Sequence, residues 1–186
     1  MSTHDKPSDS EFFELMRRAM VDSQLRPSDV TDRAIVAAMA SVPRERFVPA
    51  DRARVAYTDR SIPLGNGRSL NPPLTVGRML VAADLSRGDH VLLVGAATGY
   101  VATLLSHITA EVIALESDDA LADRAEETLG ELANVTLVRG PLAKGWSKAA
   151  PYTLILVDGA VDHIPDTFAG QLAPGGRLVT ALDDRG

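Results

Sequence analysis

A pair of glycines and an acid are spaced as in a nucleotide-binding turn. Gly95 and Gly99 lie between a short apolar run and a stretch with helical periodicity, and Glu116 ends a second apolar run about 20 residues later. Glycine lets the backbone approach a ligand, the start of a helix presents free amide groups, and an acid at this point commonly accepts hydrogen bonds from ribose hydroxyls. The pattern predicts a nucleoside site.

A purely structural interpretation of the same residues stays open. Gly95 and Gly99 could be tight-turn glycines only, with Glu116 a solvated strand end. The strand before the turn and the acid after it favour the nucleoside site. NAD is disfavoured, because the dinucleotide pattern needs glycine at two positions where this chain has Ala97 and Tyr100.

Other chemistries have little support in the sequence. The chain has no cysteine, which excludes disulfides, thiolate metal sites and a cysteine nucleophile. Its four histidines are scattered without metal-ligand spacing, and no G-x-S-x-G elbow is present, so we expect neither a metal site nor a hydrolase. A formal charge of −6 opposes binding to phosphate backbones, so nucleic acid is not an expected partner.

Residues 43–73 show no periodicity, and prolines and glycines interrupt them throughout. An irregular stretch of this length inside a compact domain is uncommon and is usually a binding loop or lid. The sequence therefore predicts a second part of the site here.

The elements around these residues predict an α/β fold. Helical spacing of apolar residues indicates two helices within residues 8–42 and a third entered through prolines near residue 73. Apolar runs then alternate with helical stretches, which is typical of a doubly wound, Rossmann-like, mostly parallel sheet with helices on both faces. The predicted strands are residues 90–95, 111–116, 134–140, 152–159 and 176–182; the predicted helices between them are residues 100–108 and 118–132, with a short amphipathic turn through Phe168 and Leu172.

The length of 186 residues suits a single domain. Residues 1–10 lack the basic-then-apolar pattern of a signal peptide, and no apolar run approaches the ~20 residues that cross a bilayer. We expect a soluble cytoplasmic protein without a membrane partner.

Several long stretches resemble the protein-L-isoaspartate O-methyltransferase family. Residues 20–49 are similar to its N-terminal signature and residues 56–73 to its substrate loop; VLLVGAATGY resembles its cofactor turn, and residues 151–165 and 171–179 its fourth and fifth strand regions. The resemblance implies one S-adenosylmethionine (SAM) methyltransferase domain over residues 1–186, with N-terminal helices and substrate loop in 1–73 and a Rossmann-like core in 74–186. It also implies methyl transfer from SAM to the side-chain carboxylate of isoaspartyl residues in damaged proteins, leaving S-adenosylhomocysteine (SAH).

The resemblance assigns site residues by position. The family's loop motif falls on residues 67–73, which implies that Ser69 and Asn71 donate to the acceptor carboxylate. The remaining implied residues are Gly67, Arg68, Leu70 and Pro73 in the substrate loop, and Gly95, Ala97, Gly99 and Glu116 for the cofactor.

The chain also departs from the family pattern. Asn71 replaces a serine, Ala97 a glycine, Leu93 an acid, Pro141 the aspartate that meets the adenine, and Asp158 a small or hydroxyl residue. We also expect the family's C-terminal hairpin to be missing. These departures leave two alternatives open, which are a SAM methyltransferase with another acceptor and a catalytically weakened homologue acting as a binding protein.

Overall fold

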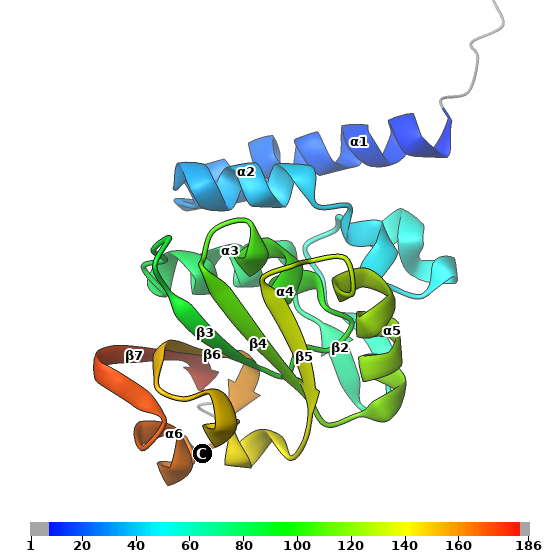
Figure 1. Cartoon of the computed structure of the whole chain (residues 1–186). Helices are drawn as coiled ribbons and strands as arrows, with labels where there is room; N and C mark the ends of the chain where they lie inside the picture. Colours follow the sequence, from blue (N-terminus) through cyan, green and yellow to red (C-terminus); the bar gives the residue numbers. More distant parts are fainter. Residues whose placement is uncertain (1–7, 183–186) are drawn as a thin grey trace, which may run out of the picture.

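Five parallel strands form the central sheet of the computed structural model, which describes residues 8–182 (Figure 1). The strands are β3 (His90–Val94), β4 (Glu111–Glu116), β5 (Val135–Arg139), β6 (Tyr152–Val161) and β7 (Leu172–Leu182). Their order across the sheet is β5-β4-β3-β6-β7, so the winding direction reverses at β3. Ligands of doubly wound folds bind at the carboxyl ends of the strands on either side of such a reversal. The predicted fold class is confirmed.

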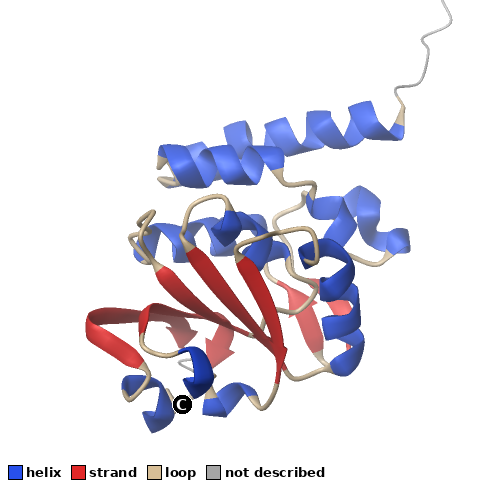
Figure 2. Cartoon of the chain, viewed as in Figure 1, coloured by secondary structure: helices blue, strands red, loops and turns tan. Residues whose placement is uncertain are grey.

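The strands are continuously apolar because both faces of the sheet are buried. One face packs against α3 (Pro73–Ala82), α4 (Tyr100–Ser106) and α5 (Asp119–Leu129), as the colouring in Figure 2 helps to show. The other face packs against Phe168 of the short helix α6 (Asp166–Ala169) and against Trp146. The predicted helices therefore cover the two faces unequally.

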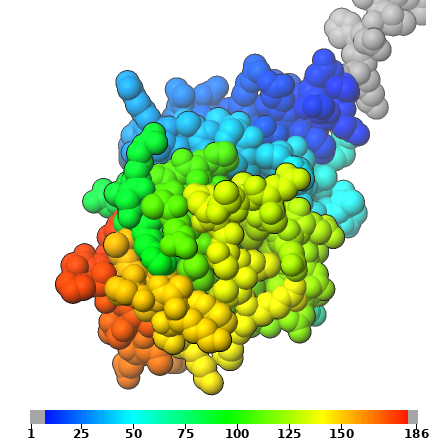
Figure 3. Space-filling view, in the orientation of Figure 1, coloured from blue at the N-terminus to red at the C-terminus, as the bar shows by residue number. Residues whose placement is uncertain are grey.

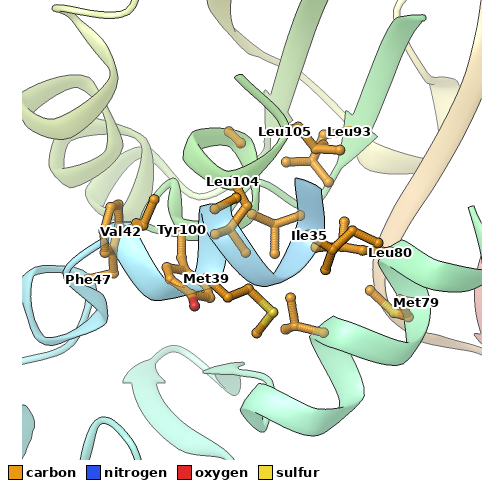
Figure 4. Close-up of a cluster of buried hydrophobic side chains, with 14 of the residues drawn as sticks. Ile35, Met39, Val42, Phe47, Met79, Leu80, Leu93, Tyr100, Leu104 and Leu105 are labelled. Carbon is orange, nitrogen blue, oxygen red and sulfur yellow. The ribbon is translucent and has the colours of Figure 1, made fainter. Parts of the chain in front are cut away.

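Two predicted N-terminal helices form a further layer over the first face. They are α1 (Asp9–Met20), which continues through one π-helical and one 3₁₀ turn to Ser28, and α2 (Arg33–Ser41). Ser8 and Asp32 cap them by accepting backbone N–H bonds. Ile35 and Met39 of α2 pack among Leu80, Tyr100 and Leu104 (Figure 4). In the space-filling view this layer lies directly on the α/β core (Figure 3).

The prediction of an irregular stretch over residues 43–73 is wrong in part. This stretch holds two 3₁₀ helices, Arg44–Phe47 and Ala50–Val55, and an antiparallel hairpin made by β1 (Ile62–Gly65) and β2 (Arg68–Leu70). The hairpin turn is Asn66-Gly67, whose φ values are 50° and 73°. Asn-Gly favours a two-residue turn with positive φ at both positions, so the sequence did contain a hairpin signal.

The remaining elements match the predictions apart from their ends. The strand predicted to begin at residue 176 begins at Leu172, so the predicted turn through Phe168 and Leu172 is divided between α6 and β7. The helix predicted for residues 118–132 ends at Leu129, where Gly130 follows. The absence of a signal peptide was inferred from residues 1–10, most of which lie outside the described residues, as do residues 183–186.

Candidate active site

The carboxyl ends of β3, β4 and β6 meet at one edge of the sheet, and the glycine turn lies there. Gly95 has φ of 83°, and the N–H groups of Gly95 and Ala96 both donate to the Leu115 carbonyl, at 2.9 and 3.0 Å. This pair of bonds fixes the turn against β4. A side chain at Gly95 would project toward Arg68 and the backbone of Asp158, so the space beside this glycine belongs to the site.

Gly99 has a different physical role. Its φ is 93°, and a Cβ atom there would lie 3.0 Å from side-chain atoms of Thr128 and Leu129 on α5. Glycine at this position lets the start of α4 pack closely against α5. Gly99 was predicted as a cofactor-binding residue, and that role stays a prediction.

Glu116 ends β4 with a side chain that is fully buried. Its Oε1 accepts from the N–H groups of Ser117 (2.7 Å) and Asp118 (2.9 Å), and its Oε2 accepts from the N–H of Ala97 (2.7 Å). Burial acts to raise the pKa of Glu116, but the hydrogen bonds from Arg68 and from the Asp118 backbone outweigh it and lower the pKa. The carboxylate is therefore ionised at neutral pH.

Arg68 of the hairpin reaches across to this carboxylate. Its Nη1 donates to Glu116 Oε1 at 2.8 Å, and its Nη2 donates to Oε2 at 3.0 Å. This is the bidentate geometry in which arginine binds carboxylates most strongly. The resemblance places Arg68 in the substrate loop, and no local pattern predicts its pair with Glu116, because the two residues are 48 positions apart.

Asn71 follows β2 and contacts the end of β6. Its Nδ2 donates to Asp158 Oδ1 at 2.7 Å, so two of the positions that depart from the family pattern contact each other. Burial raises the pKa of the Asp158 carboxyl, while the hydrogen bond from Asn71 and the nearby Arg44 charge oppose the rise. Ser69, the other predicted donor, lies exposed on the hairpin.

Arg44 binds the backbone carbonyl of Asn71, a contact that the sequence did not predict. It is fully buried, and its Nη2 donates to the Asn71 carbonyl at 2.5 Å while its Nε donates to the Ala56 carbonyl at 2.6 Å. The guanidinium lies over the Tyr100 ring, 4.7 Å from its centroid. Arg44 therefore holds the backbone at Asn71, directly after the hairpin. The only sequence signal was an arginine beside a proline in a stretch without periodicity.

The remaining predicted residues and departures lie around these contacts. Leu70 and Pro73 are buried, whereas Gly67 is exposed in the hairpin turn. Leu93 is fully buried within the sheet core, so the position of the family's acid is apolar here. Pro141 precedes a 3₁₀ turn after β5, and Leu142 of that turn approaches the Gly95 position.

Ala97 is held in a left-handed conformation with φ of 50°, which is strained for any residue with a Cβ atom. We expect Ala97→Gly to relieve this strain. Ala96→Gly, at a buried neighbour without positive φ, should only lower the free energy of unfolding. The Ala97→Gly variant should exceed Ala96→Gly in free energy of unfolding by about 1 kcal/mol. Urea unfolding of both variants measures the difference, and equal values would show that Ala97 carries no strain.

A cavity of about 320 Å³ opens beside the glycine turn. It has mainly apolar walls, and those from the sheet, the turn after β5 and α6 include Val94, Leu142, Val157 and Phe168. An ionised carboxylate beside a glycine turn and an adjoining apolar cavity are features that suit a nucleoside. A larger hollow of about 570 Å³ lies in the N-terminal layer and contains none of the predicted site residues.

Within residues 8–182, no group of three or more histidine, aspartate or glutamate side chains is arranged to hold a metal ion. No helix of the same part of the chain combines the length and apolar character needed to cross a membrane.

The sheet order and this edge define a doubly wound, Rossmann-like fold with a ligand site at the carboxyl ends of its strands. The sequence profile of the family described as "Protein-L-isoaspartate(D-aspartate) O-methyltransferase (PCMT)" matches residues 16–186. The chain belongs to this family.

Curated relatives match this chain over most of their own length. The chain is 43% identical over 165 residues to the protein-L-isoaspartate O-methyltransferase of Gloeobacter violaceus, covering 88% of this chain and 80% of the relative. It is 39% identical over 173 residues to protein-L-isoaspartate O-methyltransferase 1 of Rhodopseudomonas palustris, covering 92% and 71%.

Solved structures support the fold. A protein-L-isoaspartate O-methyltransferase superposes with a TM-score of 0.70 at 24% identity, covering 93% of this chain and 55% of that one. A Plasmodium falciparum structure, described as a putative protein-L-isoaspartate O-methyltransferase in complex with S-adenosyl-L-homocysteine, gives 0.74 at 15% identity, covering 97% and 86%.

Proposed function

We propose that this chain transfers a methyl group from SAM to the side-chain carboxylate of isoaspartyl residues in damaged proteins. Its family membership over residues 16–186 carries the proposal. The buried, ionised Glu116 beside the Gly95 turn supports it, because this arrangement suits the ribose of the cofactor.

The reaction needs little acid–base help from the protein. SAM supplies an electrophilic methyl group: a carboxylate oxygen of the acceptor forms the new C–O bond while the C–S bond breaks and its electron pair stays on sulfur. A carboxyl with a pKa near ~4 is already ionised at neutral pH, so no proton has to be removed. The protein must align the acceptor with the methyl group at roughly 3 Å and exclude water.

The residues present divide this work between the sheet edge and the hairpin. Glu116 would accept from the ribose hydroxyls, and the Gly95 turn would let the cofactor approach the backbone. Asn71 would face the acceptor, with its carbonyl held by Arg44. The role of Ser69 and Asn71 as donors to the acceptor carboxylate stays a prediction, since the Asn71 amide donates to Asp158 in this structure.

The Asn71–Asp158 contact favours one alternative function, which is methyl transfer to an acceptor other than a carboxylate. An ionised Asp158 would repel a carboxylate and attract a cationic or hydrogen-bonding acceptor. The product distinguishes the two functions, because a carboxyl methyl ester is hydrolysed by mild base and releases methanol, whereas N-methyl groups are stable.

The experiment is transfer from methyl-labelled SAM to a mixture of aged proteins, which contain isoaspartyl residues, followed by mild base. Our proposal predicts label released as volatile methanol. Label that survives base would favour the alternative acceptor, and no label together with no SAM binding would favour the binding-protein hypothesis.

Restoring the family's serine in Asn71→Ser should raise isoaspartyl turnover only when Asp158 is also restored to a hydroxyl residue. The single change leaves the Asp158 carboxyl without its 2.7 Å donor at the acceptor position. We expect kcat/KM of the double variant Asn71→Ser/Asp158→Thr to exceed the product of the two single effects by about fivefold, which is a coupling of ~1 kcal/mol. Additive effects of the two single variants would contradict a functional link between these residues.

A further inference from the structure

Glu116 has almost no free hydrogen-bonding capacity in this structure. Each carboxylate oxygen offers about two lone-pair directions. Oε1 has close donors in Ser117 N, Asp118 N and Arg68 Nη1, and Oε2 has Ala97 N and Arg68 Nη2. The three backbone N–H groups belong to the turns that shape the edge, so Arg68 is the partner that can leave without rebuilding the site.

The Arg68 guanidinium also fills the space that the glycine turn opens. A Cβ atom placed on Gly95 would lie 3.3 Å from Arg68 Nη2. The room gained by having glycine at this turn is therefore taken by an arginine from the hairpin.

The hairpin is fastened on both sides of Arg68. Asn66 Nδ2 donates to Asp118 Oδ2 at 2.7 Å, just beyond β4, and Asn71 Nδ2 donates to Asp158 at the same distance near the end of β6. Arg68 lies between these contacts with a side chain that is 26% exposed. The hairpin thus presents the guanidinium to Glu116 from a fixed position.

We propose that Arg68 occupies the place of the ribose hydroxyls on Glu116, so that Arg68 and the nucleoside cofactor compete for this carboxylate. The proposal rests on the proposed function, because it takes Glu116 as the ribose acceptor. Arg68 is then a residue that sets cofactor affinity. Cofactor binding must release Arg68 from the sheet edge, which breaks one of the contacts that hold the β1–β2 hairpin against the sheet.

With competition of this kind, the apparent affinity equals the intrinsic affinity multiplied by the fraction of molecules in which Arg68 is already released. Glutamine is too short to reproduce the bidentate pair, so Arg68→Gln should bind SAH about tenfold more tightly than the wild type if the pair is closed in about nine molecules of ten. Arg68→Lys keeps the charge but gives only a single-point contact, and its affinity should be intermediate.

The test is calorimetric titration of SAH into the full chain, with Arg78→Gln as the control because Arg78 is an exposed arginine on α3. The expected order of affinity is Arg68→Gln, then Arg68→Lys, then wild type and Arg78→Gln together. Nitrogen-15 NMR adds an independent readout, since the Arg68 Nε–H signal, assigned by its loss in Arg68→Lys, should shift when SAH binds.

Several results would overturn the competition. Equal SAH affinity in wild type and Arg68→Gln, or weaker binding in Arg68→Gln, would show that Arg68 does not compete, while leaving the proposed function intact. An equal gain in Asn66→Ala would assign the effect to loosening of the hairpin. Failure of the wild type and every variant to bind SAH would overturn the proposed function together with this inference.

Discussion

Glu116→Gln is expected to lower SAH affinity about a hundredfold and the free energy of unfolding by about 2 kcal/mol. The buried carboxylate accepts two bonds from Arg68 and three from backbone N–H groups, and an amide has only one acceptor oxygen to replace both. Its NH₂ group would instead face one set of donors. Calorimetry with SAH and urea unfolding at pH 7 measure the two losses.

The pH dependence of stability gives a second view of Glu116. Because the pKa of Glu116 is lowered from 4.5 on folding, its contribution to stability is full above pH 4.5 and is lost as the pH falls through the folded-state pKa. Glu116→Gln should lack this part of the acid destabilisation. Glu111→Gln, at the exposed start of the same strand, is the matched control, and equal behaviour of the two variants would contradict the role of Glu116.

Asp158 should make methylation of an isoaspartyl peptide decline as the pH rises. Burial raises the pKa of Asp158 above 3.8, so the carboxyl is protonated at low pH and ionised at high pH. The ionised form would repel the acceptor carboxylate. The nearby charges of Arg44 and Arg68 favour ionisation of Asp158, and that of Glu116 disfavours it. We expect Asp158→Asn to flatten the pH profile and to raise kcat/KM at pH 8 about tenfold, a fraction of the ~4 kcal/mol between two close charges near a protein surface.

The same carboxyl affects stability with the opposite sign to Glu116. The folded state binds the Asp158 proton more tightly than the unfolded state, so stability falls as the pH rises from 3.8 through the folded-state pKa. Asp158→Asn should therefore be more stable than the wild type at neutral pH. A pH profile of kcat/KM that is identical in wild type and Asp158→Asn would show that Asp158 does not act on the acceptor.

The sheet was predictable because its strands are read from local pattern. Continuous apolar runs such as residues 90–95 identify buried parallel strands, and a predicted turn at Gly95 followed by an acid at Glu116 places the ligand edge. The predicted β4, Glu111–Glu116, agrees with the structure at both ends. These features depend on neighbouring residues, which a single sequence displays directly.

The contacts between distant segments could not be read in the same way. Arg68 meets Glu116, and Asn71 meets Asp158, only because the hairpin folds back over the sheet edge. Arg44 is buried over the Tyr100 ring, and no local sequence pattern predicted this position. The hairpin itself had a local signal in Asn66-Gly67, which the many prolines and glycines around it obscured.

Isoaspartyl methylation by this chain is tested by steady-state transfer from labelled SAM to a pair of peptides that differ only in one isoaspartyl or aspartyl linkage. We expect methylation of the isoaspartyl peptide, with a carboxyl methyl ester as product, and no methylation of the aspartyl peptide. Equal methylation of both peptides, or transfer to neither while SAH binds normally, would contradict it.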